Sequence, residues 1–157
     1  MKKILIASMV SAAFVALPAS AQLYLGAGAG EAKTDSHETS WKLYGGYQIT
    51  PTWGIELGYN DLGKYRGADI ESWSLAGTGT IPLNERWSLL GKVGATDNRP
   101  DAPGTGNHTA VLLGVGVGYS LTKNVGVRLE YEDFGKLSDA GGSSRGRNVG
   151  LSLKYGF

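Results

Sequence analysis

The chain has 157 residues, no cysteine and nearly balanced charge, with 15 basic and 14 acidic residues. The lack of cysteine excludes disulfides and thiol chemistry, and the lack of a basic excess argues against nucleic acid as a partner. The length fits a single domain.

The first 21 residues have the three parts of a secretory signal peptide. Lys2 and Lys3 give a positive start, residues 4–17 are mostly apolar, and Ala19-Ser20-Ala21 is a cleavage site of small residues. The apolar run is shorter than the roughly 20 residues that a membrane-spanning helix needs. We therefore expect residues 1–21 to be removed, so that 22–157 form the mature protein with a net charge of −1.

Eight segments of the mature region alternate between apolar and small or polar residues, which predicts β-strands with one apolar face. Most of them have the roughly 9–11 residues of a tilted membrane strand. The mean hydropathy of −0.14 agrees with strands that turn half of their side chains toward a polar lumen. The expected strands cover residues 23–32, 40–49, 53–61, 69–81, 87–96, 109–121, 125–134 and 147–157.

The connections alternate in length, as they do in outer-membrane barrels with short turns in the periplasm. Both termini should then lie on the periplasmic side, and the aromatic-ended segment 149–157 should close against the first strand. The short connections are 50–52, 82–86 and 122–124, and the longer polar ones are 34–39, 62–68, 97–108 and 135–146.

All 25 glycines lie after residue 21, and many of them occupy every second position, as in residues 26–30 and 114–118. Such spacing clears one face of a strand, which suits the crowded interior of a small barrel. A soluble sandwich or lipocalin-like barrel is the alternative, but its charges would point outward.

Aromatic residues gather near both ends of the strands, as in membrane-interface girdles. They are Tyr47, Trp53, Trp87, Tyr119 and Phe157 at one end, and Trp41, Tyr59, Trp73 and Tyr131 at the other.

Three blocks of the chain resemble the transmembrane domain of the OmpA family. They are Gly45-Gly46-Tyr47-Gln48-Ile49-Thr50-Pro51 with Gly54 to Gly63, Val127-Arg128-Leu129-Glu130-Tyr131-Glu132-Asp133-Phe134-Gly135, and the closing Leu153-Lys154-Tyr155-Gly156-Phe157. The resemblance implies an all-β, eight-stranded antiparallel transmembrane β-barrel in the outer membrane of a Gram-negative bacterium. It implies no cofactor, and a monomer surrounded by lipids and lipopolysaccharide. Periplasmic chaperones and the barrel assembly machinery would recognise the last strand through Tyr155 and Phe157. The family's periplasmic peptidoglycan-binding domain is expected to be absent, and the loops are shorter than is usual.

Alternation turns a set of charged residues toward the lumen: Lys42, Glu56, Lys92, Arg128, Glu130 and Lys154, with Glu71 and Glu132 added at the extracellular rim. Buried charges are expected to pair, so the first interpretation is a structural network that fills the interior. The second is a gated pore for small ions. The resemblance implies a blocking acid–arginine pair at Glu56 and Arg128. It also puts Thr78 and Gly118 at the positions where the family has a second pair, of lysine with glutamate, so this chain lacks that pair. Gly114 and Gly116 are expected to leave further inward space, and we therefore expect the lumen to hold more water than is usual in the family.

The main functional prediction is a structural role in the envelope, with a weak pore as its sharper form. One alternative is adhesion through extracellular loops, in which the basic segment 141–147 is a candidate contact for lipopolysaccharide phosphates. The least favoured is a lipid A-modifying enzyme, for which His37 beside Ser36 and Glu38, and His108, are the only histidines available. The scattered aspartates lack the spacing of a calcium loop, so no metal site is expected.

Overall fold

The computed structural model describes residues 22–33, 37–65, 68–100, 108–136 and 145–157. Every element in these ranges is a β-strand, and none of the described residues forms a helix long and apolar enough to cross a membrane. The strands are β1 (Gln22–Lys33), β2 (His37–Gln48), β3 (Trp53–Tyr65), β4 (Ala68–Pro82), β5 (Trp87–Pro100), β6 (His108–Ser120), β7 (Val125–Lys136) and β8 (Arg145–Gly156).

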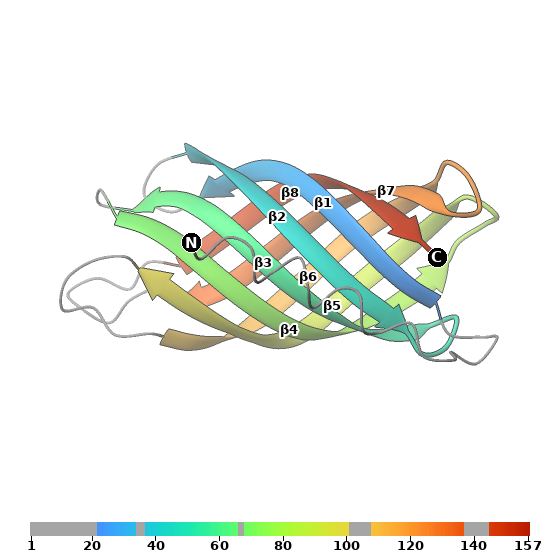
Figure 1. Cartoon of the computed structure of the whole chain (residues 1–157), viewed down its shortest axis with the longest axis horizontal. Coiled ribbons are helices and arrows are strands. Elements are labelled where there is room, and N and C mark those ends of the chain that lie inside the picture. Colours follow the sequence, from blue (N-terminus) through green and yellow to red (C-terminus); the bar gives the residue numbers. More distant parts are fainter. Residues whose placement is uncertain (1–21, 34–36, 66–67, 101–107, 137–144) are drawn as a thin grey trace, which may run out of the picture.

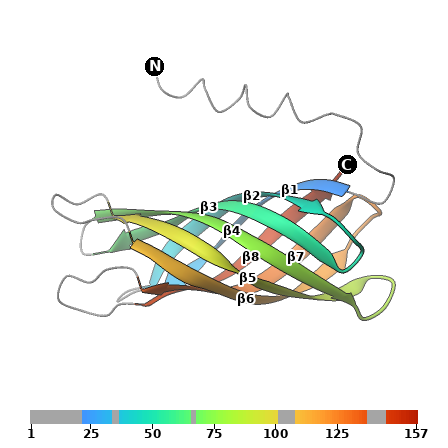
Figure 2. The same cartoon turned by 90° about the horizontal axis from the view of Figure 1, so that it is seen from below.

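The eight strands form a closed antiparallel barrel in which each pairs with its sequence neighbours and β8 pairs with β1 (Figure 1). Figure 2 shows the same tilted strands from the side. We call the end with residues 49–52, 83–86 and 121–124 the turn end, and the opposite end the loop end. The first residue of β1 and the last of β8 both lie at the turn end (Figure 1). The predicted fold class is confirmed.

Most strands extend beyond the predicted limits at the loop end. β3 continues through Tyr65 and β5 through Pro100, both within segments that were expected to be loops. β2 begins at His37, three residues before its predicted start. These extensions lack a sustained alternation of apolar residues, so hydropathy does not reveal them, whereas the ladder of backbone hydrogen bonds continues. The predicted strand ends at the loop end were therefore wrong by up to four residues.

The three turns at the turn end share one design. In each, the backbone N–H groups of the first two turn residues donate to the carbonyl of the residue after the turn, as Leu121 and Thr122 do to Val125 at 2.9 and 3.0 Å. The second turn residue then accepts two backbone N–H bonds through its side chain: Thr122 Oγ1 accepts from Asn124 and Val125 at 3.2 and 3.0 Å. Thr50 and Asn84 do the same in the other two turns.

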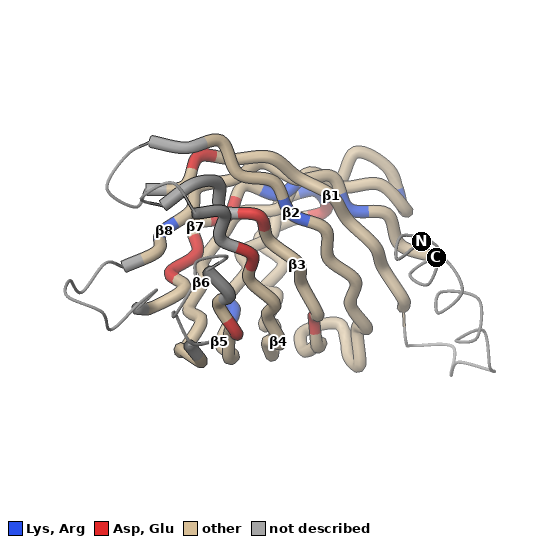
Figure 3. Tube along the Cα trace, turned by 60° about the vertical axis from the view of Figure 1, so that its left-hand side comes forward, with Lys and Arg blue, Asp and Glu red and all other residues tan. Residues whose placement is uncertain are grey.

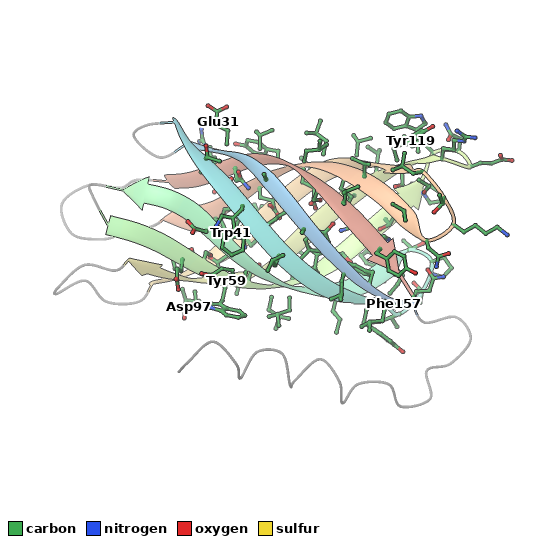
Figure 4. All side chains as sticks on the ribbon, turned by 45° about the horizontal axis from the view of Figure 1, so that its top comes forward. Glu31, Trp41, Tyr59, Asp97, Tyr119 and Phe157 are labelled. Atoms are coloured by element: carbon green, nitrogen blue, oxygen red, sulfur yellow. The ribbon has the colours of Figure 1, made fainter. Side chains whose placement is uncertain are left out.

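The outer face of the barrel is apolar across its middle and aromatic at both ends. Trp41, Tyr59 and Trp73 lie side by side on β2, β3 and β4, with ring centroids 5.3 and 5.1 Å apart and the ring planes strongly inclined to one another. Figure 4 shows Trp41 and Tyr59 toward the loop end and Phe157 toward the turn end. The exposed aliphatic side chains between them include Leu43, Ile55, Leu57, Leu75, Val93, Val111, Leu113, Val115, Leu129, Val149, Leu151 and Leu153.

Candidate functional site

The lumen of the barrel contains two tyrosines, each of which lies over a glycine. Tyr24 on β1 pairs with Gly46 on β2, and Tyr44 pairs with Gly26 across the same two strands. A Cβ atom on either glycine would collide with the facing tyrosine ring. The two buried rings meet edge to face, with centroids 6.3 Å apart. These glycines therefore leave room for aromatic rings inside a narrow barrel.

Six buried charged side chains form a belt of ion pairs across the lumen, which we call the charged belt: Lys42, Glu56, Lys92, Arg128, Glu130 and Glu132. Lys42 Nζ lies 2.5 Å from Glu130 and 3.0 Å from Glu132. Lys92 Nζ lies between 2.5 and 3.2 Å from all three carboxylates. Because these side chains are almost fully shielded from water, each charge depends on its neighbours for stabilisation. Figure 3 marks the charged residues along the Cα trace and shows that long stretches of the strands carry no charged residue.

Arg128 joins Glu56 and the two tyrosines at the turn-end side of the charged belt. Its Nη1 donates to Glu56 at 2.9 Å, and the hydroxyl of Tyr24 donates to the same carboxylate at 3.0 Å. The guanidinium also lies 5.0 Å from the ring centroid of Tyr24 and 5.4 Å from that of Tyr44, within the range of cation–π attraction. Glu56 and Arg128 thus form a buried ion pair, and both tyrosines contact it.

A small apolar cluster fills the lumen between the charged belt and the loop end. It consists of Ala32, Ala76, Leu112 and Phe134, and Phe134 is fully buried. Polar bonds surround it: Ser40 donates to Asn148 at 2.7 Å, and Thr96 donates to the carbonyl of Phe134 at 3.4 Å. This cluster adds a buried apolar layer on the far side of the charged belt.

A cavity of about 200 Å³, lined by both polar and apolar side chains, lies in the lumen at the turn end. Arg128 and Lys154 line it together with uncharged residues, among them Gln48, Ser88 and Gly118. Lys154 Nζ lies 4.8 Å from the ring centroid of Tyr24 and forms no ion pair with any described carboxylate. Lys154 therefore faces the lumen but lies outside the charged belt.

Two acidic residues lie elsewhere than the sequence suggested. Glu132 was expected at the rim but is buried within the charged belt, because β7 continues its inward face one step beyond Glu130. Glu71 was also placed at the rim of the lumen, but it is exposed on the outer face opposite Asp61. Trp73 and Leu75 point outward, and Glu71 lies two residues before Trp73 on the same strand. The alternation of the strand could therefore have predicted its outward position.

Tyr24, Tyr44 and Phe134 were not predicted as lumen residues, although their positions within each strand turn them inward. Only charged side chains were expected to fill the lumen, so its aromatic residues were missed. Gly114 and Gly116, expected to leave space, face side chains of the charged belt. A Cβ on Gly116 would lie 2.9 Å from Cγ of Glu130, and one on Gly114 would lie 3.3 Å from Cβ of Lys92.

Several predicted features lie outside the described residues. These are the signal peptide 1–21, most of the basic segment 141–147, and the side chains of His37 and His108. Within the described ranges, no three histidine, cysteine, aspartate or glutamate residues are placed to hold a metal ion.

Comparison with known proteins places this arrangement in a family. The outer membrane protein beta-barrel domain family matches residues 4–157, nearly the whole chain. The chain belongs to this family. Outer membrane protein A of Serratia marcescens is 29% identical over 150 residues, which cover 83% of this chain and 42% of that protein. The chain spans less than half of the length of the curated relatives that it matches, between 35% and 42%.

Solved structures show the same fold. The attachment invasion locus protein Ail of Yersinia pestis superposes with a TM-score of 0.60 at 18% identity, covering 90% of this chain and all of that one. The N-terminal barrel domain of Pseudomonas aeruginosa OprF gives a TM-score of 0.61 at 13% identity, covering 85% of this chain and 97% of that one. The chain is therefore an outer-membrane β-barrel, and the bacterial outer membrane, with its lipid and lipopolysaccharide, is its environment.

Proposed function

We propose that this protein is a structural barrel of the outer membrane whose lumen is closed to steady ion flow. The observation that carries the proposal is the charged belt, in which Lys92 contacts three carboxylates in the middle of the lumen. The cluster around Phe134 adds an apolar layer toward the loop end. The charged belt and the apolar cluster are two successive filled layers of the lumen. They support a structural role in the outer membrane over a transport role.

The same geometry supports the weak-pore hypothesis in a restricted form. Ions would pass only when Arg128 releases Glu56, because this pair lies between the turn-end cavity and the rest of the charged belt. Lysine and arginine side chains move on short time scales when exposed, but a buried pair in low dielectric opens rarely. Brief, infrequent openings are therefore the expected form of any conductance.

The orientation and assembly of the barrel follow from the same proposal. We assign the turn end to the periplasm, since short turns face the periplasm in barrels of this kind. Residues 1–21 would direct export and be removed. Tyr155 and Phe157, whose rings pack edge to face at 5.0 Å on the outer face, would be read by the assembly machinery, and the folded barrel would be a monomer.

Planar-bilayer recording tests the pore. Wild-type protein should show rare openings, and Arg128→Ala should increase their frequency, while Lys123→Ala in an exposed turn should behave as wild type. A large, steady wild-type conductance that Arg128→Ala leaves unchanged would contradict a closed lumen. Negligible conductance in all three would remove the pore and leave the structural role.

The structural role has a separate test in cells. Deleting the gene in its native host should increase entry of bulky hydrophobic antibiotics, and both wild type and Arg128→Ala should restore the barrier. Unchanged entry after deletion would contradict a role in envelope integrity.

A further inference from the structure

The charges inside the described lumen do not balance. Four inward cations, Lys42, Lys92, Arg128 and Lys154, face three inward carboxylates, Glu56, Glu130 and Glu132. The three carboxylates are all used by the charged belt. Among the described inward side chains, one positive charge is therefore left without an anionic partner.

The uncompensated charge is located at Lys154. Its ammonium lies beside the Tyr24 ring, while the nearest belt carboxylate, Glu56, already accepts from Lys92, Arg128 and Tyr24. An ammonium held near a guanidinium in a poorly solvated barrel is costly unless an anion or ordered water compensates it.

The cavity beside Lys154 is large enough to hold such an anion. It is about 200 Å³ in volume and lies at the turn end, and Ser88, Gly118 and Gly126 are among the residues that line it. Gln48 also lines it, and its buried amide nitrogen has no hydrogen-bond partner. Two cations thus line one cavity, and none of the described residues that line it is acidic.

We propose that this turn-end cavity is a binding site for a small inorganic oxyanion of phosphate size, held chiefly by Lys154. The cavity is larger than one such anion, so the ligand would keep part of its water shell while Lys154 donates to its oxygens. The strands of the barrel wall separate the site from lipid, so a free anion and not a lipid headgroup is the ligand. The proposal holds whether or not the barrel conducts.

Titration with inorganic phosphate tests the site, using the full mature barrel refolded in detergent micelles and followed by backbone NMR. We expect saturable shifts at the amides of Gln48, Ser88 and Gly118, and no saturable shift at the exposed turn residues Arg86 and Lys123. Lys154→Gln should weaken binding by about tenfold or more, as expected for a lost charged hydrogen bond. Lys154→Arg should retain it.

Lys123→Gln is the matched control, since Lys123 carries the same charge at the same end of the barrel but is exposed and lies outside the cavity. It should leave the cavity shifts unchanged. The proposal is overturned if wild type shows no saturable shift in the cavity, if Lys154→Gln binds as well as wild type, or if Lys123→Gln weakens binding equally. Should Lys154→Gln not fold, the position of the wild-type shifts alone decides: cavity amides support the site, and turn amides refute it.

Discussion

Inward glycines on the strands set how closely neighbouring strands and side chains can approach. Gly94 on β5 faces Ala76 on β4, and a Cβ there would collide with the backbone of Leu75 and Ala76. Gly91, on the same strand, points outward, and a Cβ there meets nothing within 4 Å. The two glycines have opposite surroundings three residues apart, so they form a natural pair for substitution.

Gly94→Ala should therefore destabilise the barrel by about 2 kcal/mol, because overpacking against fixed backbone strains the β4–β5 ladder. Gly91→Ala should leave the free energy of unfolding unchanged or raise it slightly, since alanine restricts the unfolded chain. Urea unfolding in phospholipid vesicles, followed by tryptophan fluorescence, measures both. Equal effects of the two substitutions would show that packing at Gly94 is looser than these contacts indicate.

The turns illustrate how single side chains stabilise an element. Thr122 Oγ1 accepts two backbone N–H bonds that would otherwise be left to water. Thr122→Val keeps the shape but removes the acceptor, so it should lower the free energy of unfolding by about 1 kcal/mol. Thr122→Ser keeps the acceptor and should cost less. If valine and serine have the same effect in the urea experiment, the hydroxyl is not the source of the stabilisation.

The sequence was sufficient to predict the elements wherever a membrane imposes alternation. The starts of β3, β5 and β7 were predicted at Trp53, Trp87 and Val125, because each follows a short polar turn and begins the apolar pattern. Beyond the apolar zone, residues of β3 such as Lys64 and Tyr65 pair across a register shift near Asp61 that no periodic pattern marks. Backbone pairing, not hydropathy, fixes the strand ends there.

The candidate site was partly predictable for a related reason. Alternation places a residue on the inner face but says nothing of its height or of its partner across the lumen. Glu132 therefore could not be distinguished from a rim residue, and Lys154 could not be separated from the charged belt. Which inward side chains meet depends on the register of strands far apart in sequence, which no local pattern encodes.

At the scale of the molecule, the barrel reverses the arrangement of a soluble protein. Aliphatic side chains such as Leu75 and Leu151 are exposed, whereas Lys92 and Glu130 are buried. With lipid outside, apolar burial on the outer face comes from the membrane, and the interior depends on paired charges and close packing. The stability of the barrel should therefore depend more on the ion pairs formed inside the lumen than on the total charge of the lumen.

Lys92 and Lys154 allow this last point to be tested, because either lysine→glutamine substitution removes one positive charge from the lumen. Lys92→Gln would leave three carboxylates short of a shared partner, so we expect a loss of about 3 kcal/mol in the free energy of unfolding. Lys154→Gln removes a cation that no described carboxylate pairs, so it should cost little in phosphate-free buffer. Urea unfolding in vesicles compares the two, with the exposed Lys123→Gln as the reference. Equal losses from both lumen substitutions would mean that overall charge, and not local pairing, governs the stability of the barrel.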